Sequence, residues 1–389
     1  MRLIAKEVFD RYKDGRPVAT GFVSYVSGDQ PILMHCAGRE DFSDGYDDYA
    51  VSLSRDNGRT WSAPELRWKS VSVPEGRLRY AETAAFFDPD TQKLLVLADR
   101  VLYPKDELDV DAVYSLVLDV YDGRTGAWQP RQELSITPGR SIAVSFSFPI
   151  KTTAGRWLVP AMRQVLGPDG RPVHYPGCWA PMHEPVTLIG DYEADGSIRW
   201  SLGRPVRVAP EKSSRGFDEN TLAELPGGRI AMIMRGDNSM FPDRPGYKWL
   251  AFSEDGGLTW SDPAPLPCDR GEPIESSASG SALFRSIRTG KLYWLGNLCI
   301  HGARPRGNWP RTPLVIAEMQ EEPFAVKRDT IAVIDQQQPG EPDQVQHSNF
   351  RFYQDRQNGD LVLFLTRYAE RSAEQWMLAD YYRYRIAFE

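Results

Sequence analysis

The stretch VSLSRDNGRTWSAPE, Val51 to Glu65, returns about 200 positions later as LAFSEDGGLTWSDPA, Leu250 to Ala264. Both copies fit the pattern SxDxGxTW, in which an Asp-Asn-Gly or Asp-Gly-Gly turn follows a short apolar run. Such turns predict a hairpin between two strands, because the Asp accepts hydrogen bonds from turn amides and the Gly tolerates positive φ. We therefore expect Asp56 and Asp255 to fix turns rather than to catalyse a reaction.

The composition is that of a β-rich protein. The 389 residues include 11 Trp, 17 Tyr and 16 Phe with 32 Gly and 30 Pro, an aromatic and turn-rich profile. The formal charge of −7 comes without any basic block, which argues against a nucleic-acid partner. No apolar run reaches the length of a membrane span, and the N-terminal residues lack the features of a signal peptide. We expect no membrane partner and a cytoplasmic location for the chain as given, or a secreted or periplasmic one if a signal was trimmed.

The cysteines and histidines do not predict a metal site. No CxxC pair occurs, so reduced, buried thiols are expected. His174, Cys178 and His183 lie close together in VHYPGCWAPMHEP, but a fourth ligand at zinc-finger spacing is missing. We therefore expect no metal and no cofactor.

A second repeated unit consists of an apolar strand, a tight turn and another apolar strand that often ends in Arg. The turn glycines run from Gly28 to Gly359, which spaces six such units about 66 residues apart. Six repeats without helical segments between them predict an all-β, six-bladed β-propeller of four-stranded antiparallel blades, in a single domain covering residues 1–389. The C-terminal YYRYRIAF is expected to complete a blade with N-terminal strands. The six copies are GFVSYVSGDQPILMHCAGR, AAFFDPDTQKLLVLADR, VSFSFPIKTTAGRWLVPAMR, TLAELPGGRIAMIMR, ALFRSIRTGKLYWLGN and FRFYQDRQNGDLVLFLTR.

The boxes and the six repeats resemble the sialidase superfamily, whose Asp-box or BNR repeats mark the fold. The resemblance implies a site in which three arginines bind a sugar carboxylate, a Tyr assisted by a Glu is the nucleophile, and an Asp is the acid/base. In ENTLAELPGGRIAMIMR it implies Glu219 as the assisting Glu and Arg235 as a triad arginine. Arg311 in GNWPRTPLVIAEM resembles a second triad position, with Arg304 and Arg306 as near competitors. Asp47 or Asp48, in REDFSDGYDDYAVSLSRD, resembles the acid/base.

Two positions depart from the family pattern. The segment PVATGFVSY has no Arg where the family places its first triad arginine. His347-Ser348 stands in QHSNFRFY where the family has Tyr-Ser, so the nucleophilic Tyr is replaced by His347. Imidazole transfers protons near neutral pH, and we expect His347, Glu219 and Arg235 to meet in one pocket. Because both changes affect the chemistry, ordinary sialosides are expected to be poor substrates.

Further residues are candidates for substrate contact. Arginines that end hairpin strands could line one face, although pairing with acids inside the fold is the alternative for each. Glu82 and Glu275 precede or begin strands as Glu219 does, with a solvated loop acid as the alternative. His301 is a weaker second to His347, and Trp179 lies in a long connection where an aromatic ring could stack on a sugar. The arginines are Arg39, Arg100, Arg163, Arg235 and Arg367.

These residues together predict a glycoside hydrolase that removes a terminal sugar, an acidic one included, from an oligosaccharide or polysaccharide. His347, Glu219 and Asp47 or Asp48 are the catalytic candidates. One alternative is a lyase that acts on a uronate-containing glycan with His347 as base. Another is a glycan-binding propeller without catalysis. An unsaturated uronate product would identify the lyase, and binding without turnover would identify the non-catalytic protein.

Overall fold

The computed structural model describes residues 1–13, 15–107, 111–136, 142–178, 180–271, 273–299, 302 and 304–388. The fold is all-β, and the predicted fold class, a six-bladed β-propeller of small antiparallel sheets, is confirmed. The chain forms two compact units, each with three sheets. Unit 1 consists of Met1–Ser145, Asn349–Tyr368 and Gln375–Glu389, and unit 2 of Phe146–Ser348 and Ala369–Glu374.

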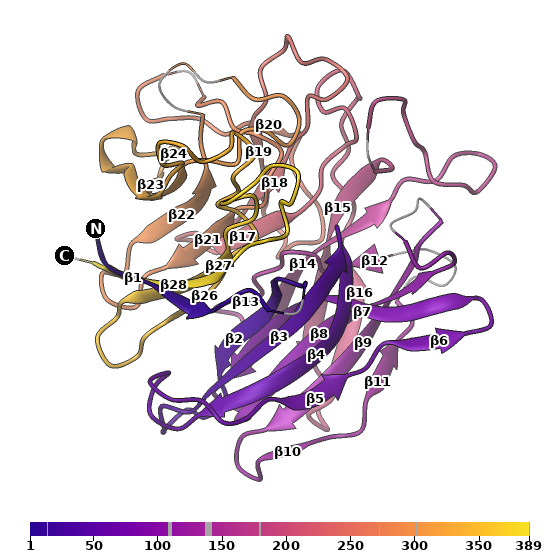
Figure 1. Ribbon diagram of the computed structural model, residues 1–389, viewed down its shortest axis with the longest axis vertical. Helices are drawn as coiled ribbons and strands as arrows, with labels where there is room; N and C mark the ends of the chain where they lie inside the picture. Colours follow the sequence, from indigo (N-terminus) through magenta and orange to yellow (C-terminus); the bar gives the residue numbers. More distant parts are fainter. Residues whose placement is uncertain are drawn as a thin grey trace. The chain divides into compact units, whose positions relative to one another are not determined.

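Unit 1 contains three antiparallel sheets. Its first sheet has the order β2-β3-β4-β5, and these strands lie side by side in Figure 1. The strands are β2 Val18–Tyr25, β3 Leu33–Phe42, β4 Gly45–Ser54 and β5 Glu65–Trp68. The second sheet has the order β10-β9-β8-β7-β6, and β11 also pairs with β9. Its strands are β6 Val71–Val73, β7 Gly76–Asp88, β8 Lys93–Tyr103, β9 Val113–Asp122, β10 Ala127–Trp128 and β11 Gln132–Leu134, and a short β12, Ile142–Ala143, follows in the chain.

The third sheet of unit 1 joins the two ends of the chain, as predicted from YYRYRIAF. Its order is β1-β28-β27-β26, and the C-terminal β28 pairs antiparallel with the N-terminal β1. Figure 1 shows the yellow β28 beside the indigo β1. The strands are β1 Arg2–Asp10, β26 Arg351–Gln354, β27 Leu361–Thr366 and β28 Tyr381–Ala387.

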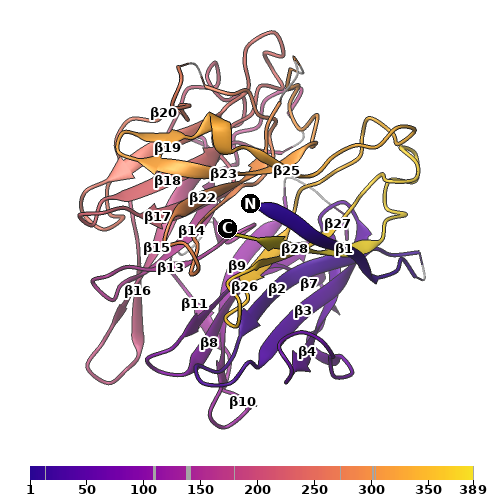
Figure 2. The same ribbon diagram turned by 90° about the vertical axis from the view of Figure 1, so that its left-hand side faces the viewer.

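Unit 2 also contains three antiparallel sheets. In the first, β13, β14, β15 and β16 pair in succession; in the second the order is β17-β18-β19-β20, and Figure 2 shows β17, β18 and β19 side by side. The third has the order β21-β22-β23-β24, and β25 also pairs with β23. The bounds are β13 Ile150–Lys151, β14 Trp157–Gln164, β15 His183–Tyr192, β16 Ile198–Leu202, β17 Asn220–Glu224, β18 Ile230–Arg235, β19 Lys248–Ser253, β20 Ala264–Pro265, β21 Ala282–Arg285, β22 Leu292–Asn297, β23 Leu314–Glu321, β24 Phe324–Val326 and β25 Ala332–Asp335, with one 3₁₀ turn, η1, at Arg328–Thr330.

All six repeated units form strand pairs: β2–β3, β7–β8, β13–β14, β17–β18, β21–β22 and β26–β27. The second strands read as continuous apolar runs because both of their faces are buried; all six residues of β18, IAMIMR, are buried. In unit 1 the core contains Tyr49 and Trp68, and in unit 2 it contains Trp294. Burial of large aromatic side chains is the main source of stability in each core.

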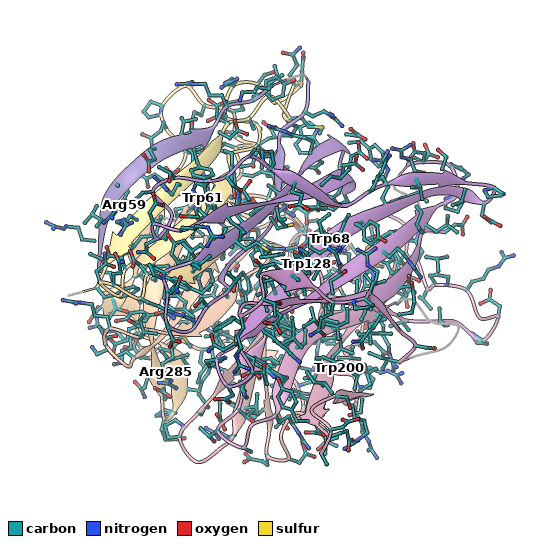
Figure 3. All side chains as sticks on the ribbon, turned by 90° about the horizontal axis from the view of Figure 1, so that it is seen from below. Arg59, Trp61, Trp68, Trp128, Trp200 and Arg285 are labelled. Carbon is teal, nitrogen blue, oxygen red and sulfur yellow. The ribbon has the colours of Figure 1, made fainter. Side chains whose placement is uncertain are left out.

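The two boxes fix turns between paired strands, as predicted. Asp56 Oδ1 accepts hydrogen bonds from the backbone N–H groups of Arg59 and Thr60 at 3.1 and 2.8 Å, and Oδ2 accepts one from the Thr60 hydroxyl at 2.6 Å. Asp255 repeats these contacts with Leu258 and Thr259. Figure 3 labels Trp61, the tryptophan of the first box, near Arg59. The Asp side chains are thus occupied by the turns, which leaves the chemistry to other residues.

The four cysteines, Cys36, Cys178, Cys268 and Cys299, are buried and free. None of the described residues belongs to a helix long and apolar enough to cross a membrane.

Candidate functional site

A small polar pocket of about 20 Å³, partly open to solvent, lies within unit 1. Three sheets contribute to it: β2 and β4 of the first, β7 of the second, and β26 and β27 with their flanking residues of the third. Hydroxyl, amide, carboxylate and guanidinium groups line most of its wall. The lining residues are Val18, Ala19, Thr20, Tyr46, Glu82, Asn349, Arg351, Thr366 and Tyr368.

Bulges in the strands aim the polar groups of this pocket. In β7 the register shifts between Tyr80 and Thr83, and Glu82 lies inside that shift. In β2 the register shifts between Thr20 and Phe22, and the extra residue is Gly21. A Cβ at Gly21 would lie 2.8 Å from Cys36 Sγ, so the close approach of the two strands requires glycine there. Bulges commonly redirect side chains beside functional sites, and here they turn a strand carboxylate and a backbone carbonyl toward one guanidinium.

Arg351 is that guanidinium. Its Nε donates to the carbonyl of Gly21 at 2.9 Å, its Nη1 to the carbonyl of Phe350 at 3.1 Å, and its Nη2 to Glu82 Oε2. Arg351 is buried, whereas Glu82 retains 16% of its side-chain exposure. The ion pair therefore presents mainly its carboxylate to a ligand in the pocket.

A second carboxyl group acts on the pocket through a tyrosine. The hydroxyl of Tyr368, which lines the pocket, hydrogen-bonds Oε2 of the buried Glu40, and Glu40 Oε1 accepts the N–H of Asp44 at 3.1 Å. Burial raises the pKa of Glu40 from 4.5 to about 8, against the opposing effect of the Tyr368 hydrogen bond. Glu40 is thus protonated at neutral pH, while Glu82 is ion-paired with Arg351. A protonated carboxyl group close to a second, ion-paired carboxyl group is an arrangement that suits acid and base catalysis.

Tyr46 connects the acids of this pocket. Its hydroxyl lies 3.2 Å from Asp44 Oδ1 and 3.4 Å from Glu82 Oε1. Burial raises the pKa of Tyr46, and the neighbouring charges of Asp44 and Glu82 raise it further. The phenol therefore stays protonated and can donate a hydrogen bond.

In unit 2, Glu219 and Arg235 come together as the sequence predicted. Glu219 precedes β17, Arg235 ends β18, and backbone hydrogen bonds join Arg235 N to Glu219 O at 3.0 Å and Asp218 N to Arg235 O at 3.1 Å. Nη1 of Arg235 lies 2.6 Å from both carboxylate oxygens of Glu219, and Nη2 donates to Asn308 Oδ1 at 2.9 Å. Burial alone would lower the pKa of Arg235, but the charges of Glu219 and Asp218 outweigh it and raise the pKa. The guanidinium of Arg235 is permanently charged and is already ion-paired with the carboxylate of Glu219.

Asp218 extends this cluster to a histidine. Its Oδ1 lies 3.1 Å from His183 Nδ1, its Oδ2 pairs with Arg215, and Arg235 Nε lies 3.6 Å away. Burial opposes ionisation of Asp218, but Arg215 and the other cationic neighbours lower its pKa, so it is a carboxylate. The His183 side chain is 13% exposed. Neither His183 Nδ1 nor Asp218 Oδ1 has a hydrogen-bond partner among the described residues, so their contact is a close ion pair and not a hydrogen bond.

The sequence SSRGFDEN holds His183 and Asp218 in place. Gly216 pairs with His183 as a parallel bridge: His183 N donates to Arg215 O at 2.9 Å and Phe217 N donates to His183 O at 3.1 Å. Gly216 has φ +74°, and a Cβ there would lie 2.0 Å from His183 O. Only glycine satisfies both the backbone conformation and the close approach.

Arg311, the second predicted triad position, joins the same network in unit 2. Its Nη1 donates to Gln346 Oε1 at 3.0 Å, and its Nη2 to the carbonyl of Ala278 at 3.3 Å. Ala278 N donates to Gly307 O at 2.8 Å, and the residue after Gly307 is the Asn308 that binds Arg235. The two predicted arginines are therefore linked through two short loops.

In unit 2, His347 is fully buried and Glu275 is partly exposed. The side chain of His347 has 0% exposure, and its Nε2 lies 3.6 Å from Asp335 Oδ2. An imidazole in this position has no exposed surface to offer a substrate. Glu275 accepts the N–H of Cys299 through its backbone carbonyl at 2.7 Å, and its Oε2 is buried without a hydrogen bond among the described residues.

Asp47 and Asp48 are held by neighbours in unit 1. Asp47 lies 3.1 Å from Arg16, 3.4 Å from Arg77 and 3.6 Å from Arg79. Burial raises its pKa, but a hydrogen bond with Ser70 and the charges of Arg79 and Arg77 lower the pKa overall. Asp48, at φ +31°, accepts the N–H of Ser70 at 2.7 Å. A carboxylate held by three arginines is poorly suited to donate a proton.

Four predicted arginines have structural contacts. Arg39 pairs with Asp10 at 2.9 Å, Arg100 with Glu133, and Arg163 with the buried Glu184 at 2.7 Å. Arg367 lies over the ring of Tyr382, 5.6 Å from its centroid. The first three thus show the acid pairing that was the alternative for each, whereas Arg367 packs on an aromatic ring. His301 and Trp179 lie outside the described residues.

Signals in the sequence for the other groups are weak or absent. Arg351, Glu40 and Tyr368 were not candidates, although Arg351 is a charged residue at the start of strand β26 and Tyr368 directly follows Arg367. Lys248 was also missed: its buried ammonium donates to the carbonyls of Ser277 and Ser279 at 2.8 and 2.6 Å, and burial lowers its pKa to about 7. Among the described residues, no group of three or more His, Cys, Asp or Glu side chains could hold a metal ion.

The chain is similar in sequence to one protein family and in fold to several solved structures. The profile of the BNR repeat-like domain matches residues 43–349. The intramolecular trans-sialidase from Ruminococcus gnavus, solved in complex with oseltamivir carboxylate, is 13% identical with a TM-score of 0.66, and the match covers 100% of this chain and 98% of that one. A variant of the NanB sialidase from Streptococcus pneumoniae is 13% identical with a TM-score of 0.63, and the match covers 98% of this chain and 70% of that one. The Trypanosoma rangeli sialidase in complex with sialic acid is 14% identical with a TM-score of 0.62, and the match covers 98% of this chain and 58% of that one. No curated protein matches the chain.

Proposed function

Because the chain belongs to the family of BNR repeat-like domains and is a divergent member of the sialidase superfamily, we propose that it is a glycoside hydrolase that removes a terminal sugar from an oligosaccharide or polysaccharide. The observation that carries the proposal is the unit 1 pocket, where a protonated carboxyl group acts through a tyrosine and a second carboxyl group is ion-paired. Two carboxyl groups with different protonation are what hydrolysis of a glycosidic bond needs.

The groups of the pocket divide into an acid and a base. Tyr368 gives its hydroxyl proton to the leaving glycosidic oxygen as the bond from that oxygen to the anomeric carbon breaks, and Glu40 replaces the proton on Tyr368. Glu82 faces the positive charge that develops on the sugar and takes a proton from the water that adds to the anomeric carbon. The proton then returns from Glu82 to Glu40 through solvent.

The unit 2 cluster is proposed as a separate glycan-binding site. Glu219 retains 15% of its side-chain exposure and can accept sugar hydroxyls while Arg235 holds it. Arg311 is partly exposed and offers further donors. In this proposal Glu219 and Arg311 bind glycan in unit 2 and take no part in bond cleavage.

The uronate lyase with His347 as base is less well supported, because that imidazole is fully buried beside Asp335. The test is incubation with a panel of nitrophenyl glycosides and with uronate-containing polysaccharides, followed by product analysis. A hydrolase releases nitrophenol and a free sugar, whereas a lyase yields an unsaturated uronate that absorbs in the ultraviolet. Binding of a glycan without either product would contradict the proposal in favour of a non-catalytic protein.

A further inference from the structure

Among the described residues that line the unit 1 pocket, Arg351 is the one cation, and it is already occupied. All three of its nitrogens donate hydrogen bonds, to Gly21 O, to Phe350 O and to Glu82. A guanidinium that binds a ligand carboxylate needs a free pair of N–H groups on one edge. In Arg351, Nη2 already donates to the carboxylate of Glu82, so a ligand carboxylate would have to compete with Glu82 for it.

Other charged groups near the pocket include acids and an arginine that is already paired with acids. Tyr46, on the pocket wall, hydrogen-bonds both Glu82 and Asp44. The nearby Arg79 is held by Asp41 at 2.8 Å and Asp106 at 2.9 Å, and it donates to the backbone of Tyr46. A sugar carboxylate in the pocket would therefore lie near Glu82 and Asp44, and the described lining residues would offer it no cation of its own. Like charges placed together cost binding energy, and they are an effective way to reject a ligand.

The remaining lining groups suit an uncharged sugar. The phenol hydroxyls of Tyr46 and Tyr368 and the side-chain amide of Asn349 can each donate and accept hydrogen bonds. The carboxylate of Glu82 is an acceptor for sugar hydroxyls. A site that matches hydroxyl groups in this way rejects ligands that leave its polar groups unpaired.

We propose that the unit 1 pocket selects an uncharged terminal sugar, and that Glu82 is the residue that excludes acidic sugars by occupying Arg351. This inference rests on the proposed function for the assignment of the pocket to a terminal sugar. It departs from a site built around arginines that grip a sugar carboxylate. It also implies that removing the Glu82 charge makes Arg351 available to an acid.

The test is calorimetric titration of the full chain with methyl glycosides of galactose, glucose, mannose and N-acetylglucosamine, against glucuronate, galacturonate and N-acetylneuraminate. The parent is expected to bind at least one neutral glycoside, and at least about tenfold more tightly than any of the acids. Glu82→Gln keeps the shape of the side chain and is expected to strengthen binding of an acidic sugar by roughly tenfold. The matched control is Glu133→Gln, which breaks the Arg100–Glu133 pair outside the pocket and is expected to leave the parent's ranking intact.

A parent that binds no neutral glycoside, or that prefers an acid, overturns the inference. A Glu82→Gln variant that folds but gains no affinity for acidic sugars also overturns the inference. If Glu82→Gln does not fold, the parent's ranking of neutral and acidic sugars decides alone. Hydrolysis is measured separately on the same compounds. If the chain binds neutral glycosides but hydrolyses none, the proposed hydrolase function is wrong and the proposed selectivity stands. If it hydrolyses glycosides of acidic sugars, the hydrolase function stands and the selectivity is wrong.

Discussion

Replacement of Glu40 by Gln is expected to remove a large alkaline instability of the fold. Burial raises the pKa of Glu40 from 4.5 to about 8, so between these values the folded chain keeps a proton that the unfolded chain has lost. The stabilising contribution is complete below pH 4.5 and is lost as the pH rises through 8. At 1.36 kcal/mol for each pH unit, the free energy of unfolding falls by about 5 kcal/mol across this window.

The amide that Glu40→Gln introduces keeps the shape of the side chain and can still hydrogen-bond Tyr368 and Asp44, but it has no proton to lose. Urea denaturation followed by tryptophan fluorescence at pH 5, 7 and 9 measures the difference. Relative to the parent, Glu40→Gln is expected to gain stability steadily with pH, by roughly 2–5 kcal/mol between pH 5 and pH 9. Glu133→Gln, which breaks a partly exposed ion pair, should follow the parent at every pH. A stability difference between Glu40→Gln and the parent that is constant from pH 5 to pH 9 would refute the reasoning.

Three further substitutions test other parts of the structure. Replacing the Asp of either box, Asp56 or Asp255, by Ala should lower the melting temperature at neutral pH and leave kcat unchanged. Because hydrogen bonds hold both pKa values at about 2, this loss of stability should vanish as the pH falls toward 2. An inactive variant as stable as the parent would contradict the turn role. Glu219→Gln leaves a buried guanidinium with a weaker partner and should cost about 1–3 kcal/mol in urea denaturation, so an unchanged midpoint would count against the ion pair. Gly216→Ala should cost roughly 2 kcal/mol or more, because its Cβ would collide with the carbonyl of His183, and a fully stable variant would show that the close approach is not required.

The sequence predicted those parts of the structure that depend on local patterns. Turn chemistry identified the boxes, and the spacing of apolar hairpins identified six sheets. Glu219 and Arg235 could be paired in advance because they stand at the two open ends of one hairpin, where strand register brings them opposite each other. Such contacts are set by a few neighbouring residues.

The unit 1 pocket depends on contacts that no local pattern encodes. Tyr368 and Glu40 are 328 positions apart in the chain, and Glu82 is 269 positions from Arg351. Glu82 and Gly21 are also placed by bulges, whose positions do not follow from strand alternation. His347 was chosen for its chemistry, but burial depends on the packing of the strands around it, which one sequence does not reveal. Its catalytic role stays a prediction, and the geometry favours Tyr368.

The most direct measurement is kcat for Tyr368→Phe on the best neutral glycoside found for the parent, across pH 5 to 9. Loss of the hydroxyl removes the proton donor and its link to Glu40 while the ring stays in place, so kcat is expected to fall by roughly 10²–10⁴-fold in a variant that still folds. A folded Tyr368→Phe variant with the kcat and pH profile of the parent would contradict the account.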